Sequence, residues 1–226
     1  TLKTVDAFLE RQPYDSEILV VENGSSDLTA VVTEAFAADH PRVRLIRAQG
    51  RGKGRAVRRG MLEGAGQYRF ICDADLSMPI EEVAKFLPPE LAGYDVAIGS
   101  REAPGARRFN EPAYRHIQGR VFSNIVKLLV MPGFEDTQCG FKCFRAAAAR
   151  DLFSVQVFDG MSFDVEVLYI ARKRGYKIVE VPIDWYYRSE SRVQPLMDPL
   201  RILRDTLVIR RHWSQGRYSP RTDARP

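Results

Sequence analysis

Short apolar runs alternate with amphipathic segments along this chain, and this alternation limits its fold more than any other feature. We expect strands at residues 17–22, 43–46, 69–73, 95–99, 140–144 and 177–185, and helices at 27–38, 53–63, 80–87, 113–130, 146–153, 163–174 and 200–213. This βαβα order predicts an α/β fold with a mostly parallel sheet covered by helices. Residues 1–10 already have helical spacing, which indicates that a first strand is missing ahead of Thr1.

Length, charge and cysteine content limit the number of domains and the kinds of partner that we expect. A chain of 226 residues can form one domain, expected at 1–213, with a tail at 214–226. The net charge of +5 favours anionic partners without naming one. Three cysteines argue against a disulfide framework and predict a reducing compartment. No apolar run approaches the ~20 residues that span a bilayer.

Two carboxylates, Asp73 and Asp75, stand where the apolar run 68–72 ends. An unpaired buried carboxylate is strongly disfavoured, so these groups must face a cleft, a cation or water. Open α/β sheets place ligands at the carboxyl ends of their strands. Hard oxygen ligands at such a place suit Mg²⁺ or Mn²⁺ carrying phosphate oxygens. Asp-rich turns also follow strands for conformational reasons, which leaves a plain turn open.

The segment 20–27 (VVENGSSD) has the pattern of a strand, a tight turn and a helix start. Ser25 or Ser26 is the expected N-cap of the helix. Backbone N–H groups at such a turn can hold a nucleotide, and Asn23 or Asp27 could bond a base or ribose. A capped turn without a ligand is the alternative interpretation.

The segment 50–55 (GRGKGR) is a second candidate phosphate loop. Its glycines allow close approach of the backbone to a phosphate, and Lys53 and Arg55 add positive charge. The spacing of a P-loop is absent, and a basic flexible turn is the alternative.

Arginines gather after the strand expected at 95–99, namely Arg101, Arg107, Arg108, Arg115 and Arg120. Their guanidinium groups match phosphate oxygens bidentately. The Gly- and Pro-rich stretch 102–112 is expected to be a mobile loop. A solvated charged face is the alternative for these arginines.

Cys139 and Cys143 could ligate a metal, but no second Cys/His pair accompanies them, so two core thiols are the simpler interpretation. Asp164 and Glu166 open the helix expected at 163–174, where the helix dipole favours acids. Pro182 within the last expected strand indicates a sheet edge or a bulge.

Together these residues resemble family 2 inverting glycosyltransferases of the GT-A fold, a three-layer α/β/α sandwich. The branch that transfers glucose or mannose to dolichyl phosphate or polyprenyl phosphate is the most similar. The likeness rests on 20–29 (VVENGSSDLT), 50–60 (GRGKGRAVRRG), 73–77 (DADLS), 98–102 (IGSRE), 136–153 and 163–185. The last two segments look more like the glucosyl members. This chain has Asn23 where the family usually has Asp, and the family's opening strand is missing before Thr1.

The resemblance implies an activity and a set of roles. The implied reaction moves a hexose, with glucose favoured, from a nucleotide sugar, with UDP-glucose favoured, to polyprenyl or dolichyl phosphate with inversion. The implied donor contacts are Asn23, Ser25, Asp27, Lys53, Gly54 and Asp73, and the implied acceptor contacts are Arg101, Arg115, Arg120 and Gln138. Asp73 and Asp75 are the implied catalytic pair, and Asp75 with Asp73 would hold Mg²⁺ or Mn²⁺ as a Lewis acid.

Two related activities and one unrelated function are alternatives. The donor could be GDP-mannose with the same lipid acceptor. A hydroxyl acceptor in polysaccharide or glycolipid synthesis would need a base, with Asp136 or Asp164 as candidates, whereas a phosphate acceptor is already largely dianionic and needs none. The unrelated alternative is a non-enzymatic module that binds a nucleotide or nucleic acid through the basic surface. Nucleic acid is not expected, because the arginines are not interleaved with exposed aromatics in a recognised RNA-binding motif.

The amphipathic helix expected at about 196–213 has two apolar stripes. One consists of Leu196, Leu200, Leu203 and Leu207, and the other of Ile202, Ile209 and Trp213. Basic residues beside apolar ones suit an anionic membrane interface. We therefore expect peripheral binding on the cytoplasmic face of a membrane, with Ile209 and Trp213 as contacts. Burial of both stripes is the alternative. No oligomeric state is predicted.

Overall fold

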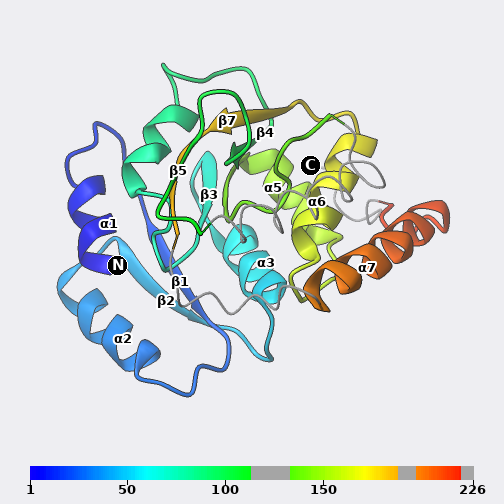
Figure 1. Ribbon diagram of the computed structural model, residues 1–226. Coiled ribbons are helices and arrows are strands. Elements are labelled where there is room, and N and C mark those ends of the chain that lie inside the picture. Colours follow the sequence, from blue (N-terminus) through cyan, green and yellow to red (C-terminus); the bar gives the residue numbers. More distant parts are fainter. Residues whose placement is uncertain (113–132, 188–196, 220–226) are drawn as a thin grey trace.

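The computed structural model describes residues 1–112, 133–187 and 197–219. Its helices are α1 Leu2–Leu9, α2 Thr29–Asp39, α3 Lys53–Glu63, the 3₁₀ helix η1 Ile80–Phe86, α5 Ala146–Ser154, α6 Phe163–Lys173 and α7 Met197–Ser214. Its strands are β1 Ile18–Glu22, β2 Val43–Arg47, β3 Tyr68–Cys72, β4 Val96–Ser100, β5 Arg107–Phe109, β6 Phe141–Arg145, β7 Ile178–Pro182 and β8 Asp184–Tyr186. Figure 1 shows how these elements are arranged.

The central sheet has the strand order β3-β6-β4-β7. Strand β4 pairs parallel with β7, whereas β6 runs antiparallel to both β3 and β4. Two smaller sheets, β1-β2 and β5-β8, are both parallel. The predicted mostly parallel sheet is confirmed, with β6 as the reversed strand of the described part. Because β6 is reversed, the residues before it lie at the same sheet edge as the residues after β3 and β4.

Helices cover the central sheet on both faces, as a three-layer sandwich requires. Side chains of successive strand residues point to opposite faces. In β4, Val96 and Ile98 pack in a cluster with residues of α3, α5, α6 and α7. Ala97, between them, packs in a second cluster with residues of α1 and η1. Figure 1 shows α5, α6 and α7 beyond one side of the strands and α1 with η1 on the other.

Several local predictions need correction. Helix α2 begins at Thr29 after Leu28, so neither Ser25 nor Ser26 caps it. The stretch 102–112 was expected to be a mobile loop. It contains strand β5, whose pairing with β8 holds the stretch in the fold. Pro182 ends β7 at the edge of the sheet, as predicted. The helix expected at 113–130 lies outside the described residues, and the strand expected ahead of Thr1 stays a prediction.

Helix α7 buries the stripe that was expected to face a membrane. Ile202 and Ile209 belong to the core cluster, and Trp213 packs on Tyr169 with the ring centroids 6.2 Å apart. The prediction that Ile209 and Trp213 contact lipid is therefore wrong. Leu207, on the other stripe, is 63% exposed. Among the helices described, none combines the length and the apolar character needed to cross a bilayer.

The first residues of the expected tail pack on the domain. Tyr218 is only 2% exposed, and its hydroxyl donates to Glu166 Oε1 at 2.8 Å. The Arg174 guanidinium also donates to the carbonyl oxygen of Tyr218. The chain after α7 is thus anchored to α6 as far as Tyr218.

Candidate functional site

Two segments far apart in the sequence meet at the carboxyl edge of β3. Cys72, the last residue of β3, is paired with Phe141, the first residue of β6. Gly140 therefore lies against Asp73, and a Cβ atom at position 140 would stand 2.0 Å from Asp73 Oδ2. Only glycine leaves room for the Asp73 carboxylate in this position. The site accordingly combines the 73–75 motif with residues 136–140.

Lys53 provides the counter-charge of Asp73. Its Nζ lies 2.8 Å from Oδ1 and 3.0 Å from Oδ2 of Asp73. Burial acts to lower the pKa of Lys53, but the charges of Asp73 and Asp164 outweigh burial and raise it. Lys53 is the first residue of α3, so the loop 50–55 delivers an ammonium group directly to the carboxylate motif.

Asp75 is exposed and has a carboxylate oxygen to offer a ligand. Its Oδ1 accepts a hydrogen bond from the Ser77 amide at 2.9 Å, and within the described structure Oδ2 has no protein partner. Leu76, between Asp75 and Ser77, has a positive φ of 48°, a backbone conformation that non-glycine residues rarely adopt. The turn after β3 thereby holds the Asp75 carboxylate in an exposed position.

A divalent ion fits this carboxylate better than it fits Asp73. Both oxygens of Asp73 lie beside the Lys53 ammonium group, whereas Asp75 keeps one oxygen open. In the described part of the chain no group of three or more His, Cys, Asp or Glu side chains could enclose a metal. Mg²⁺ commonly binds through one or two carboxylates and completes its shell with waters and substrate phosphates. Asp75 with Asp73 suits that type of site.

The turn after β1 is held by the protein's own groups. The Glu22 carboxylate accepts the N–H groups of both Gly24 and Ser25. Asp27 Oδ1 accepts the amide of Thr29 at 3.0 Å. The N–H groups of Gly24 and Ser25 are thus satisfied within the protein, which agrees with the alternative of a capped turn. Asn23 instead ties this turn to the next loop, since its Nδ2 donates to Gly52 O at 2.6 Å.

The glycines of the segment 50–55 serve packing inside the protein. A Cβ atom at Gly52 would stand 2.2 Å from Asp159 O, and one at Gly54 would stand 2.6 Å from Phe158 O. Gln156 Nε2 also donates to Gly54 O at 2.9 Å. Their small size therefore lets residues 156–160 cross the start of α3. This explains the glycine pattern without a phosphate, while the Lys53 side chain still reaches Asp73.

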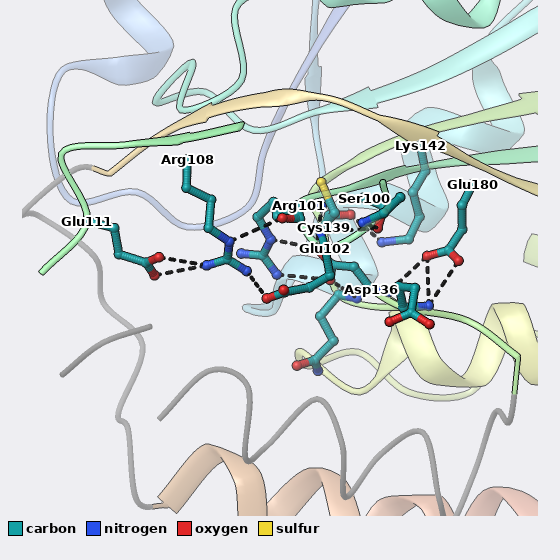
Figure 2. A network of polar contacts seen from close by, with 12 residues as sticks. Ser100, Arg101, Glu102, Arg108, Glu111, Asp136, Cys139, Lys142 and Glu180 are labelled. Carbon is teal, nitrogen blue, oxygen red and sulfur yellow. Dashed lines mark hydrogen bonds and ion pairs between the residues drawn. The ribbon is translucent and has the colours of Figure 1, made fainter. Parts of the chain in front are cut away.

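Arg101 is engaged with a buried carboxylate. Its Nε donates to Asp136 Oδ2 at 2.6 Å and its Nη2 to Asp136 Oδ1 at 3.0 Å. Glu180 fixes the same segment by accepting the amides of Glu135 and Asp136 at 2.9 Å (Figure 2). Burial would raise the pKa of Asp136, but the charge and hydrogen bonds of Arg101 lower it to about 2. Gln138 lies beside this pair, because its amide donates to Asp136 Oδ1.

The other described arginines of this group also carry ion pairs. Arg107 Nε donates to Asp184 Oδ1 at 2.9 Å. Arg108 binds Glu111 at 2.8 Å and also pairs with Glu102, as Figure 2 shows. Arg115 and Arg120 lie outside the described residues. The structure thus gives these arginines partners within the fold.

Lys142 and Asp164 form a buried ion pair that the sequence did not indicate. Lys142 Nζ lies 2.6 Å from Asp164 Oδ1, and the side chains are 1% and 3% exposed. Burial raises the pKa of Asp164 against the attraction of Lys142 and Lys53. Asp164 lies in the first turn of α6, as predicted, and is an interior group. A lysine between Phe141 and Cys143 in an apolar strand was the signal available.

The two cysteines around β6 are core thiols, as the simpler interpretation predicted. Both Cys139 and Cys143 are buried. Burial raises the pKa of each to about 12, so both are protonated thiols at neutral pH.

Comparisons with known proteins extend over most of the chain. A family model described as "Glycosyl transferase family 2" matches residues 1–153. A dolichyl-phosphate beta-glucosyltransferase of Trichomonas vaginalis is 34% identical over 201 residues, covering 83% of this chain and 59% of that protein. The dolichyl-phosphate beta-glucosyltransferase of Saccharomyces cerevisiae is 32% identical over 225 residues, covering 89% of this chain and 66% of that protein. The chain thus spans less than two thirds of either relative.

Among solved structures, glucosyl-3-phosphoglycerate synthase from Mycobacterium tuberculosis is similar in fold. That protein was solved with Mn²⁺, uridine-diphosphate-glucose and phosphoglyceric acid. The TM-score is 0.57 at 16% identity, covering 97% of this chain and 76% of that one.

Proposed function

Because this chain belongs to glycosyl transferase family 2 and has the GT-A fold, we propose that it transfers a hexose from a nucleotide sugar to polyprenyl or dolichyl phosphate. Glucose is the favoured sugar and UDP-glucose the favoured donor, and the product is β-linked by inversion. The two relatives are dolichyl-phosphate beta-glucosyltransferases, which supports this sugar and this acceptor. The geometric support is the meeting of Asp75, the Lys53–Asp73 pair and residues 136–140 at one sheet edge.

The donor side of the site is proposed around the two aspartates. Asp75, with Asp73, would hold Mg²⁺ or Mn²⁺, which supplies Lewis-acid stabilisation of the leaving nucleoside diphosphate. Lys53 fixes the Asp73 carboxylate and adds a positive charge at the same place. Asn23, Ser25, Asp27 and Gly54 are the further proposed donor contacts, of which Asn23 already joins the two loops.

The low pKa of Asp136 and the burial of Asp164 favour a phosphate acceptor over a hydroxyl acceptor. A hydroxyl group needs a base, and Asp136 is a poor one because its pKa of about 2 beside Arg101 gives the carboxylate little affinity for a proton. Asp164 is buried and paired with Lys142. A phosphate monoester is already largely dianionic at neutral pH and requires no base.

The acceptor side is proposed around residues 136–140. Gln138 is half-buried beside the Arg101–Asp136 pair, at the edge where Asp73 lies. Arg101, Arg115 and Arg120 are the further proposed contacts. Since Arg101 already gives two N–H groups to Asp136, its contact with an acceptor would use its remaining N–H groups.

Transfer of labelled sugar tests the function directly. Purified protein is offered UDP-glucose or GDP-mannose with polyprenyl phosphate, with Mg²⁺ or Mn²⁺ and then with excess EDTA. We expect glucosyl-phosphate lipid from UDP-glucose and no product in EDTA. Asp75→Asn should abolish turnover, while Asp15→Asn, at an exposed position, should not. Mannose incorporation or glucosylation of a hydroxyl acceptor in place of lipid phosphate would contradict the proposal.

A lipid acceptor also implies that the protein binds a membrane surface. We propose peripheral binding at the cytoplasmic face through the outer side of α7, where Leu207 is exposed and Leu203 half-buried. Basic residues beside exposed apolar ones suit an anionic interface.

A further inference from the structure

A cavity of about 470 Å³ lies between the start of α3, the end of α5 and the turn after α7. Its lining includes Arg55, Arg58 and Arg217, one carboxylate, Asp159, and the hydroxyl groups of Ser154 and Ser219. This volume falls in the range of small-molecule pockets. None of the described residues that are proposed for sugar transfer lines it.

The cavity lies on a different flank of α3 from the carboxylate motif. Lys53, the first residue of this helix, reaches Asp73. Arg55 follows two residues later, which turns its side chain by roughly 200° around the helix axis. Arg55 accordingly points to Asp159 and the cavity, with its Nε 3.1 Å from Asp159 Oδ2.

The charges that line the cavity do not cancel. Asp159 pairs with Arg55. Arg58 donates instead to uncharged carbonyl oxygens, those of Phe153 at 3.0 Å and Ser154 at 3.3 Å. Among the described lining residues, three guanidinium groups and one carboxylate therefore leave two net positive charges. Unbalanced cationic charge in a concave place attracts anions.

A carboxylate behind the cavity wall forms its hydrogen bonds with other groups of the protein. Glu166 is completely buried, and its two oxygens accept the amides of Val157 and Phe158 and the hydroxyl of Tyr218. Burial raises its pKa against these hydrogen bonds. Glu166 thus holds the wall together; it interacts with the charge of Arg58, but its described hydrogen bonds go to other groups.

Two of the guanidinium groups are held in place by neutral partners. The carbonyl oxygens at the end of α5 fix Arg58, and His212 fixes Arg217, whose Nη1 lies 2.9 Å from His212 Nε2. The pKa of His212 is lowered by burial and by the charges of Arg217 and Arg211, which favours the neutral ring that this contact requires. Preorganised groups lose less freedom when they bind a ligand.

We propose that this cavity binds a phosphate group, carried either by a lipid headgroup or by a soluble phosphate ester. Guanidinium groups match phosphate oxygens in charge and geometry, and the serine hydroxyl groups can donate to further oxygens. The cavity has room for a small polar body attached to the phosphate. This site is additional to the proposed transfer site and does not depend on that activity.

Titration of the isotope-labelled full chain with glycerol 3-phosphate tests the site, with NMR of backbone amides as the readout. We expect shifts at residues 154–157 and 217, and none at 73–77. Arg217→Gln should weaken binding roughly tenfold or more, because one charge-assisted contact is lost. Arg59→Gln is the matched control, since Arg59 lies on the same helix and pairs with Glu63. Thermal unfolding of both variants should match that of the unmodified chain.

The source of the phosphate is separated by a second probe, soluble dihexanoyl phosphatidic acid below its micelle concentration. Tighter binding of this lipid than of glycerol 3-phosphate assigns the cavity to a lipid headgroup, and equal binding assigns it to phosphate esters in general. The proposal is overturned if neither probe shifts residues 154–157. It is also overturned if Arg59→Gln weakens binding as much as Arg217→Gln does.

Discussion

At the scale of single residues, the Arg101–Asp136 pair has the clearest energetic consequence. Asp136 is 4% exposed and accepts two side-chain hydrogen bonds and one backbone hydrogen bond from Arg101. A buried charge that loses its partner is strongly destabilising. The pair therefore holds the segment before β6 against the end of β4.

We predict that Asp136→Asn lowers the free energy of unfolding by about 3 kcal/mol, because the charge of Arg101 is left without its partner. Urea unfolding at neutral pH measures the change. Asp184→Asn is the control, since Arg107, its partner, is mostly exposed, and a loss below about 1 kcal/mol is expected there. If both variants lost the same free energy of unfolding, the Arg101–Asp136 pair would not be more stabilising than the exposed pair.

The same pair predicts a dependence on pH. The pKa of Asp136 is about 2 in the folded chain and 3.8 ordinarily. Protonation therefore favours the unfolded chain, so the stabilisation is fully present above pH 3.8 and is lost as pH falls through about 2. Acid unfolding followed by circular dichroism should show a smaller loss over this interval in Asp136→Asn than in the unmodified chain. If the two proteins lost stability equally as the pH falls, the protonation of Asp136 would not be the cause.

At the scale of elements, the reversed strand β6 makes the site. Its start lies beside the end of β3, and Gly140 leaves the space that Asp73 occupies. The position of one carboxylate thus depends on the absence of a side chain in a segment far away in the sequence.

We predict that Gly140→Ala greatly reduces sugar transfer with little change in stability. The added methyl group meets the mobile end of the Asp73 side chain, which can turn away at the cost of its contact with Lys53. Gly160→Ala is the control, because a Cβ atom there meets nothing within 4 Å. The measurements are the sugar-transfer rate and the thermal unfolding of both variants. Normal transfer by Gly140→Ala would refute the role of Gly140 in positioning Asp73.

Periodicity in the sequence predicted the helices and strands better than it predicted how they pair and pack. It located α3 at the residues observed, since the glycines mark its start clearly. It could not give the direction of β6, because an apolar strand has the same pattern in either orientation. The partner of Arg101 lies 35 residues away, a contact that only the fold creates. For α7, two apolar stripes were visible, but their burial depends on where α6 lies.

At the scale of the whole molecule, α7 presents an apolar and basic surface far from α2. Figure 1 shows these two helices at opposite ends of the molecule. We predict that Leu207→Glu weakens binding to phosphatidylserine vesicles, because Leu207 is 63% exposed and a carboxylate would face the anionic surface. Binding of the unmodified chain should fall as salt rises.

Vesicle co-sedimentation measures this effect, and α2 offers a matched control. Val31 is 60% exposed, so Val31→Glu adds the same charge at a similar exposure on the distant helix. Unchanged vesicle binding by Val31→Glu is expected. If both substitutions weaken binding equally, or if neutral vesicles bind as well as anionic ones, α7 is not the membrane contact.

The ammonium group of Lys53 beside Asp73 has a consequence for the order in which ligands arrive. Two carboxylates and one ammonium group leave the motif with a single net negative charge. A divalent cation alone would overcompensate that charge, whereas a cation together with a diphosphate would not. Metal and nucleotide should therefore bind with positive cooperativity, each raising the other's affinity by the same factor. Replacing Lys53 with methionine should relax that interdependence and let Mn²⁺ bind alone.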